Sequence, residues 1–273
     1  MAMTINKFVM LVAVPALIIT FMADAPIRKF NFDILGAYFL TEFVLYVAAV
    51  LIARVIFNLE IKEAFLVGTT IALTNHILFV LPIAEQLYGQ AAVVPVVSII
   101  VMDGILLFSI SIIMMDVLSS SDQTWEKTLL KICSNPPLIA IVFGLVIGLL
   151  EFKLPIGLDL FLTSLGGTAS PALLFSLGVI LSQNKIRFNE PIVWVMIVIK
   201  LVAHPIFAFY LFTKLVNISP DDLNPAMLVA AAPCGVMGLM LAINYKVRTE
   251  LIALAILYTS IGSLMTLTVA AAL

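Results

Sequence analysis

The stretch IALTNHILFVLPIAEQLYG, residues 71–89, places Asn75 and His76 in the middle of an apolar run, and Pro82 follows six residues after His76. Asparagine favours helix caps and turns over helix interiors, because its side chain competes for backbone hydrogen-bonding groups. The stretch therefore predicts a helix that is interrupted near its centre. Since Pro82 lies beyond that centre, the interruption is expected at Asn75 and its neighbours rather than at the proline.

The composition around this stretch is that of an integral membrane protein. Of the 273 residues, 63% are hydrophobic and 11% are charged, whereas soluble domains average about 45–50% apolar and about 25% charged residues. The net charge of −2 and the lack of a basic run argue against nucleic acid as a partner. Two cysteines, Cys133 and Cys234, are too few for a disulfide framework or a metal site.

Apolar runs of about 20 residues are needed to cross a bilayer as a helix. They predict an all-α membrane fold with nine spans, of which the first is the weakest. The predicted spans cover about 8–23, 34–57, 64–84, 91–115, 134–150, 158–182, 191–213, 223–245 and 250–272. The longest polar connector, residues 116–131, predicts a linker between spans four and five.

The distribution of lysine and arginine predicts the orientation. If connectors alternate between two sides, nine basic residues fall on the side of the N-terminus and four on the other. Cytoplasmic loops carry the excess of positive charge. The N-terminus and the linker are therefore expected in the cytoplasm and the C-terminus outside.

Recurring motifs predict an internal repeat. Pro-Ala-Leu at 15–17 returns at 171–173, and Tyr88 returns as Tyr245 at nearly the same offset. Spans one to four then match spans six to nine, so residues 1–115 form an incomplete N-terminal repeat and 132–273 a complete C-terminal one. Five spans separate the copies, which makes the repeat inverted, as in many secondary transporters. The first span of a ten-span pattern is expected to be missing.

The same offset pairs the two interrupted spans. AAAPCGVMGLM, residues 230–240, contains Pro233, which removes a backbone donor, and it aligns Pro233 with His76. Two breaks that cross near the midplane would direct two helix N-termini at one point, where an anionic ligand fits. The alternative is a pair of proline or asparagine kinks that serve only packing.

Charged side chains in the interior of the predicted spans, away from the span ends, are few, namely Glu42, Asp103 and Lys200. Each is costly inside a bilayer, so each should face a partner or water. One interpretation gives Lys200 to the ligand site and makes Glu42 or Asp103 a proton or cation carrier. The other is a buried Glu–Lys pair that only fixes helix positions. His204, four residues after Lys200, is expected to be a packing histidine.

With these residues in view, the chain resembles the auxin efflux carrier family, a branch of the superfamily that also holds bile acid/sodium symporters. The resembling segments are NKFVMLVAVPAL (6–17), TNHILFVLPIAEQLYG (74–89), NPPLIAIVFGLVIG (135–148), SPALLFSLGVIL (170–181), IKLVAHPIFAF (199–209) and AAPCGVMGLMLAINYKV (231–247). The resemblance implies crossed broken helices and a dimerising scaffold. It also implies organic-anion substrates, which are auxins in plants and malonate or related carboxylates in bacteria.

The resemblance further matches Lys200 and Glu42 to a family lysine and a family acidic residue, and it matches the crossover positions to 75–76 and 233–234. We therefore predict a secondary active carrier of a small carboxylate, with no cofactor and no enzymatic activity, in the cytoplasmic membrane of a prokaryote. The predicted substrate-binding residues are Asn75, His76, Pro233, Cys234, Gly235 and Lys200, and the predicted coupling residues for a proton or sodium are Glu42 and Asp103.

An elevator-type motion is predicted, in which a crossover part (about 64–115, 134–150 and 223–272) slides against a scaffold (about 8–57 and 158–213). The scaffold is expected to form a homodimer. The alternatives are a sodium-coupled symporter of the bile-acid type and a membrane receptor or subunit that does not transport. An intramembrane enzyme is disfavoured, because the sequence has no HExxH, GxSxG or paired-aspartate motif.

Overall fold

The structure is a computed structural model that describes residues 2–89, 92–119, 125–183, 190–216, 218 and 220–272. Residues 120–124 of the predicted linker lie outside these ranges. Every regular element of the described residues is a helix. The α-helices are α1 (Ala2–Phe8), α2 (Val14–Ala23), α3 (Phe32–Leu51), α4 (Ile61–Ala72), α5 (Leu81–Tyr88), α6 (Val93–Asp103), α7 (Ser109–Leu118), α8 (Trp125–Cys133), α9 (Pro136–Leu149), α10 (Ile156–Gly166), α11 (Ala169–Gln183), α12 (Pro191–Val198), α13 (His204–Leu211), α14 (Pro220–Ala231), α15 (Met237–Asn244) and α16 (Glu250–Ala271).

Several of these α-helices continue into one another through single π-helical turns, which widen the helix locally without ending it. The joining turns are η1 (Val9–Ala13), η6 (Gly104–Phe108) and η7 (Ile199–Ala203). The turns η3 (Ile52–Ile56) and η8 (Phe212–Val216) follow α3 and α13 as their last turns, η4 (His76–Val80) leads into α5, and η2 (Ile27–Lys29) is a short 3-10 turn in a loop.

Six helical stretches of the described residues are long and apolar enough to cross a membrane. They are Ala2–Ala23, Phe32–Ile56, Val93–Leu118, Ile156–Ser182, Pro191–Val216 and Glu250–Ala271. The first begins at Ala2 rather than near residue 8. The helix includes Lys7, whose side chain is exposed, so this charge does not mark the start of the helix. α9 is apolar but has only 14 residues. The protein is therefore a helical, multi-pass membrane protein, and the count of nine spans and the inverted repeat stay predictions.

Two further helix pairs are interrupted. α4 ends at Ala72, the backbone is extended at Leu73, and helix resumes at His76. α14 ends at Ala231, and α15 begins only at Met237. Pro82 lies in the first turn of α5, downstream of the break. The expected position of the first interruption is thus confirmed.

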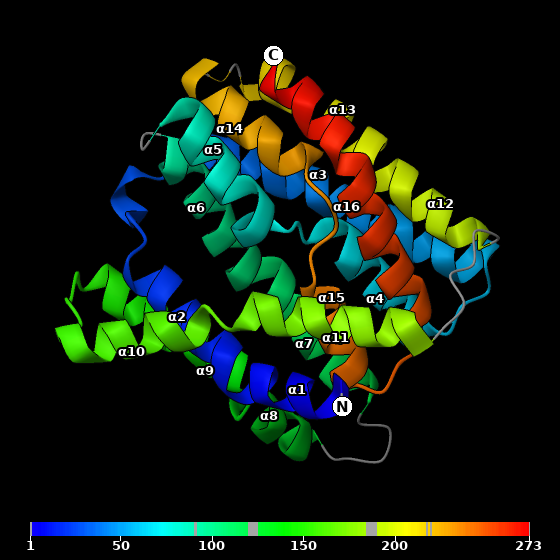
Figure 1. The fold of residues 1–273 in the computed structure, drawn as a ribbon, viewed down its shortest axis with the longest axis horizontal. Helices are drawn as coiled ribbons and strands as arrows, with labels where there is room; N and C mark the ends of the chain where they lie inside the picture. The colour runs from blue at the N-terminus through cyan, green and yellow to red at the C-terminus, as the bar shows by residue number, and fades with distance from the viewer. Residues whose placement is uncertain are drawn as a thin grey trace.

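The helices pack in two groups, which Figure 1 shows along the lower side and above it. In the first group α9 and α10 pack against α2, and α11 contacts α1. Glycines permit the close approach: a Cβ at Gly144 would lie 2.7 Å from Met22 Cβ, and one at Gly166 would lie 2.7 Å from Leu17 Cα. Small residues at helix contacts are a general feature of membrane proteins.

The second group contains both interrupted pairs. α3 packs against α4 and α13, while α16 packs against α12 and α14, and α6 contacts α14. The sequence assigns α9 to the crossover part, and α3, α12 and α13 to the scaffold. In the structure α9 packs against α2, whereas α3 and α13 pack against α4 and α14 of the interrupted pairs.

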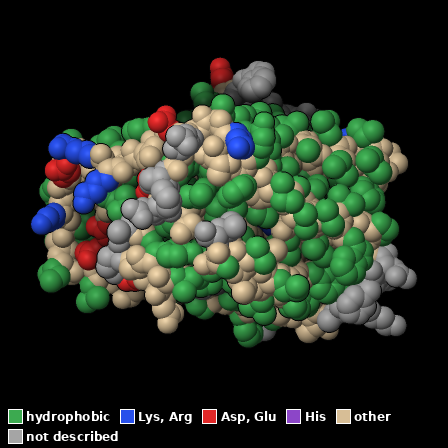
Figure 2. Space-filling view, turned by 90° about the horizontal axis from the view of Figure 1, so that it is seen from above, with side chains coloured by type: hydrophobic (Ala, Val, Ile, Leu, Met, Phe, Trp, Pro, Cys, Tyr) green, Lys and Arg blue, Asp and Glu red, His purple; other side chains and the backbone are tan. Residues whose placement is uncertain are grey.

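Apolar side chains cover the outside of the molecule. Hydrophobic atoms dominate the face seen in Figure 2, and charged side chains gather toward its left end. Ile156 and Met265 are 90% and 77% exposed, while Glu42 and Lys200 are fully buried. This inversion of the soluble pattern suits a lipid environment, in which apolar surface needs no cover and charged groups need partners.

Candidate functional site

The two helix breaks meet and hydrogen-bond to each other through the backbone. Thr74 and Cys234 form an isolated antiparallel bridge. The Asn75 N–H donates to the Pro233 carbonyl over 3.1 Å, and the Gly235 N–H donates to the Leu73 carbonyl over 2.7 Å. Extended backbone at membrane depth is tolerated only when its polar groups are satisfied within the protein. The two breaks satisfy each other.

Two glycines make this approach possible. A Cβ at Gly235 would lie 2.9 Å from the Leu73 oxygen and 3.0 Å from the Thr74 oxygen. A Cβ at Gly238, in the first turn of α15, would collide with the side chain of Thr70 on α4. Any side chain at either position would therefore separate the two interrupted pairs.

Lys200 lies against the crossing and fastens it to η7. Its Nζ donates to Thr74 Oγ1 over 2.6 Å and to the Ala72 carbonyl over 3.4 Å. Ala72 is the last residue of α4, and its carbonyl belongs to the partially negative end of that helix, which a cation stabilises. The ammonium thus replaces part of the hydrogen bonding that α4 loses at the break.

Two aromatic side chains complete the polar cluster around Lys200. His204 Nδ1 lies 3.0 Å from Lys200 Nζ. Because an ammonium only donates, Nδ1 accepts, and the proton of the neutral ring is on Nε2. The ring of Tyr38 lies 5.6 Å from that of His204, and the Tyr38 hydroxyl is 3.4 Å from Thr74 Oγ1. His204 Nε2 has no hydrogen-bond partner among the described residues, so its role as a packing histidine stays a prediction.

Two buried carboxyl groups lie near this cluster. His76 Nε2, at the start of η4, is 3.2 Å from Asp103 Oδ2 at the end of α6. The carboxyl group of Glu42 interacts with Asp103, Tyr38 and Lys200, yet no hydrogen bond of standard geometry from the described residues reaches either of its oxygens. Two carboxyl groups, two imidazoles and one ammonium are therefore buried close together.

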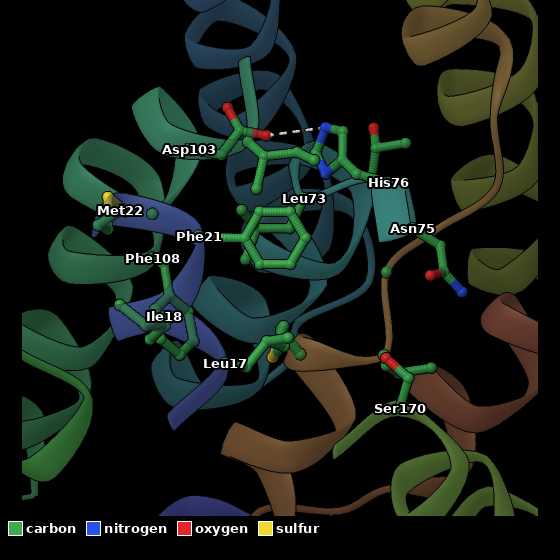
Figure 3. Close-up of a pocket in the computed structure, with 16 residues that line it drawn as sticks. Leu17, Ile18, Phe21, Met22, Leu73, Asn75, His76, Asp103, Phe108 and Ser170 are labelled. Atoms are coloured by element: carbon green, nitrogen blue, oxygen red, sulfur yellow. Dashed lines mark ion pairs between the residues drawn. The ribbon is translucent and has the colours of Figure 1, made fainter. Parts of the chain in front are cut away.

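A cavity of about 100 Å³ lies at the crossing, between the two helix groups (Figure 3). Its lining includes Asn75, His76, Asp103 and Gly235 from the second group. The first group contributes α2 side chains and Ser170, at the start of α11. In Figure 3 the Asn75 amide points away from His76 and toward the side of Ser170.

Unpartnered hydrogen-bond donors lie in residues of the cavity wall. Asn75 is 5% exposed, and its Nδ2 has no partner among the described residues. Although Asn75 precedes η4, its side chain does not cap that helix. The first backbone hydrogen bond of α15 runs from the Met240 N–H to the Val236 carbonyl, so the N–H groups of its first turn have no partner within the helix. Val236 and Met237, which open that turn, line the cavity.

A larger hollow of about 560 Å³ adjoins the cavity and is lined by α2, α5, α6 and α10. We call it the vestibule. Leu17 and Phe21 on α2 line both spaces, so these two side chains lie between the vestibule and the cavity. Asp24 and Pro26 line the outer part of the vestibule, at the loop that follows α2.

The predicted site residues gather at one place but not on one surface. Asn75, His76, Gly235 and Asp103 line the cavity. The other four are buried close to it without lining it: Pro233 and Cys234 in the crossing, Lys200 against it, and Glu42 beside Asp103. Thr74, Ser170 and the α2 side chains were not predicted. Thr74 could have been noticed as the hydroxyl next to Asn75, and Ser170 as the polar first residue of the SPALL motif.

Comparison with known proteins assigns the chain to a family. The family described as "Membrane transport protein" matches residues 2–271. An uncharacterized transporter of Methanocaldococcus jannaschii is 30% identical over 146 residues, which is 51% of this chain and 46% of that relative. The chain thus aligns with about half the length of that relative. The family predicted from the motifs is confirmed, whereas the bacterial malonate type stays a prediction. The chain belongs to the membrane transport protein family, whose members move solutes across membranes.

Proposed function

We propose that the protein is a secondary active carrier of a small organic anion and that it works by elevator-type alternating access. The observation that carries this proposal is the hydrogen-bonded crossing of two interrupted helices beside a cavity with unpartnered donors. Carriers with paired broken helices bind their substrates at such breaks, where helix N-termini attract anionic groups.

The substrate carboxylate would be held at the second helix group. Asn75 Nδ2 and the first-turn N–H groups of α15 supply the hydrogen bonds. Pro233, Cys234 and Gly235 shape the crossing that presents them. Lys200 acts through the crossing, because its Nζ bonds Thr74 and the end of α4.

Coupling would use the two buried carboxyl groups. Glu42 and Asp103 face a single buried lysine, Lys200. One ammonium balances one carboxylate, so the second requires a proton, a sodium ion or a protonated His76. Binding or release of that cation would change the charge beside the substrate cavity.

The packing supports a division into a scaffold and a part that moves against it. α1, α2, α9, α10 and α11 would form the scaffold, and α3–α7 with α12–α16 would carry the crossing. The cavity and the vestibule are both lined from the two groups, which suits a substrate path between them. The proposed scaffold would also form the homodimer contact.

With the N-terminus in the cytoplasm of a prokaryote, the vestibule would open to the outside. On the opposite side, one contact between the two groups would then close the cytoplasmic path, and a second contact would stabilise that end of the second group. Asn6 Nδ2 donates to the Met240 carbonyl over 3.2 Å, and the Tyr245 hydroxyl donates to Asp116 over 2.9 Å. Both contacts join helices at the end of the molecule away from the vestibule.

Reconstitution in proteoliposomes tests the proposed function. Radiolabelled carboxylates should exchange across the membrane, and Asn75→Ala should abolish exchange without unfolding the protein. A carboxylate that binds but never exchanges would replace the carrier with the receptor alternative. Exchange that is strictly dependent on sodium, but not on pH, would favour the symporter alternative. Wild-type exchange by Asn75→Ala would overturn the site.

A further inference from the structure

The donors of the cavity are concentrated on one side. Asn75 Nδ2 and the first turn of α15 come from the crossing. Ser170 faces them from the first turn of α11, a helix of 15 residues, and Figure 3 shows it below Asn75. The buried amide of Asn75, the first-turn N–H groups of α15 and the Ser170 hydroxyl together can surround one carboxylate with N–H and O–H donors.

The opposite side of the cavity is apolar. Ile18 and Met22 from α2 and Phe108 from η6 form it, and Figure 3 shows them together on the side away from Asn75 and Ser170. Phe21 projects between the two sides. Such a wall favours alkyl or aromatic carbon, since each buried methylene contributes about 0.8 kcal/mol.

The charged side chain in the lining excludes a second anionic group. Asp103, paired with His76, occupies the remaining end of the cavity, and no lysine or arginine of the described residues lines it. A second carboxylate on the ligand would lie against apolar side chains or against Asp103. Burying an unpaired charge in either place is strongly unfavourable.

The volume restricts the length of the ligand. A cavity of about 100 Å³ is several times smaller than the pockets of ~300–1,000 Å³ that hold drug-sized ligands. Short aliphatic acids occupy a space of this order. Leu17 and Phe21 close the cavity toward the vestibule, so a longer or aromatic acid would have to displace them.

We infer that the substrate is a short-chain aliphatic monocarboxylate, held by its carboxylate between Asn75 and Ser170 with its alkyl end against Ile18, Met22 and Phe108. This inference rests on the proposed function and narrows it, because a dicarboxylate such as malonate is disfavoured. Ser170 becomes a substrate-binding residue contributed by the scaffold side of the cavity.

Two matched pairs of acids test the inference. Butyrate and succinate differ by replacement of a terminal methyl with a carboxylate, and propionate and malonate differ in the same way. The purified protein should unfold at a higher temperature with butyrate or propionate than with the matched dicarboxylate. In proteoliposomes the monocarboxylate should exchange at an affinity at least about tenfold higher, a difference of about 1.4 kcal/mol.

Two variants on one helix test the role of Ser170. Ser170→Ala should weaken butyrate binding about threefold to tenfold, as expected for one lost hydrogen bond. Ser176→Ala is the matched control: Ser176 lies on the same helix, is fully buried, does not line the cavity, and its hydroxyl has no hydrogen-bond partner among the described residues. It should bind butyrate as the wild type does.

The outcomes separate this inference from the proposed function. Equal or tighter binding of succinate and malonate would overturn the monocarboxylate inference and leave the carrier intact. Identical butyrate affinities for Ser170→Ala and Ser176→Ala would remove Ser170 from the site. If neither monocarboxylates nor dicarboxylates stabilise the protein or exchange across the membrane, both the inference and the proposed function fail.

Discussion

The Gly235 N–H donates to the Leu73 carbonyl over 2.7 Å, and this bond joins two helix breaks that lie 162 positions apart in the chain. The same oxygen lies 2.9 Å from where a Cβ at position 235 would be. The hydrogen bond therefore requires glycine at position 235, since a side chain there would push the two backbones apart and lengthen the bond.

Gly235→Ala should consequently destabilise the protein and abolish transport. Overpacking a close contact costs about 1–3 kcal/mol, and here it also opens two backbone hydrogen bonds. Thermal unfolding in detergent measures the first effect and carboxylate exchange the second. Gly178→Ala on α11 is the control, because a Cβ there meets nothing within 4 Å. Equal melting temperatures for the two variants would contradict the crossing geometry.

Lys200 and Glu42 should be energetically coupled. Both are fully buried, and removal of one partner leaves a buried charge without compensation, at about 3–5 kcal/mol. Lys200→Met should therefore be strongly destabilising. Lys200→Met combined with Glu42→Gln should recover part of the lost stability. Unfolding temperatures of the two single variants and the double variant form the cycle, and strict additivity would mean that the residues do not interact.

Asp103→Asn should separate driven uptake from exchange. The variant keeps the shape of the side chain near His76 but removes the charge that a proton or cation would neutralise. Accumulation driven by an ion gradient should be lost, whereas exchange of substrate at equal concentrations should persist. Asp33→Asn, at an exposed position at the start of α3, is the control. Gradient-driven accumulation by Asp103→Asn would assign coupling elsewhere.

Tyr245→Phe should destabilise the second helix group at its end opposite the vestibule. The Tyr245 hydroxyl donates to Asp116 Oδ1 over 2.9 Å and also lies 3.3 Å from the Ile112 carbonyl. A hydrogen bond to a charged group contributes about 1.5–3 kcal/mol. The variant should unfold at a lower temperature than Tyr210→Phe, since Tyr210 is 58% exposed on α13. Indistinguishable melting curves would show that this contact does not stabilise the second group.

The sequence predicts the membrane class, the family and the place of the first break, because each depends on local composition. The Asn75 side chain competes for the backbone hydrogen bonds of a helix, whereas Pro82 is tolerated in the first turn of α5. The sequence marks Ser170 as a polar residue in an apolar span, but its place in the cavity depends on how α11 packs against α1 and on where the crossing lies. Those are long-range contacts, which leave no periodic signal along the chain.

The grouping of helices was less predictable for the same reason. α9 follows the linker in sequence, but its small residues fit it against α2: a Cβ at Gly148 would collide with the Met22 carbonyl. α3 precedes α4 and packs along it. Sequence order suggests neighbours, whereas the shapes of helix surfaces decide between several possible partners.

Four of the side chains that line the cavity come from a single helix, α2: Leu17, Ile18, Phe21 and Met22. The proposed carboxylate donors, Asn75, Ser170 and the first-turn N–H groups of α15, come from other segments of the chain. Recognition of the anionic group and selection of the carbon skeleton are thus encoded in separate segments. Transplanting residues 14–23 from a relative into this chain should therefore transfer the relative's choice of acid, while the capacity to carry an anion is retained.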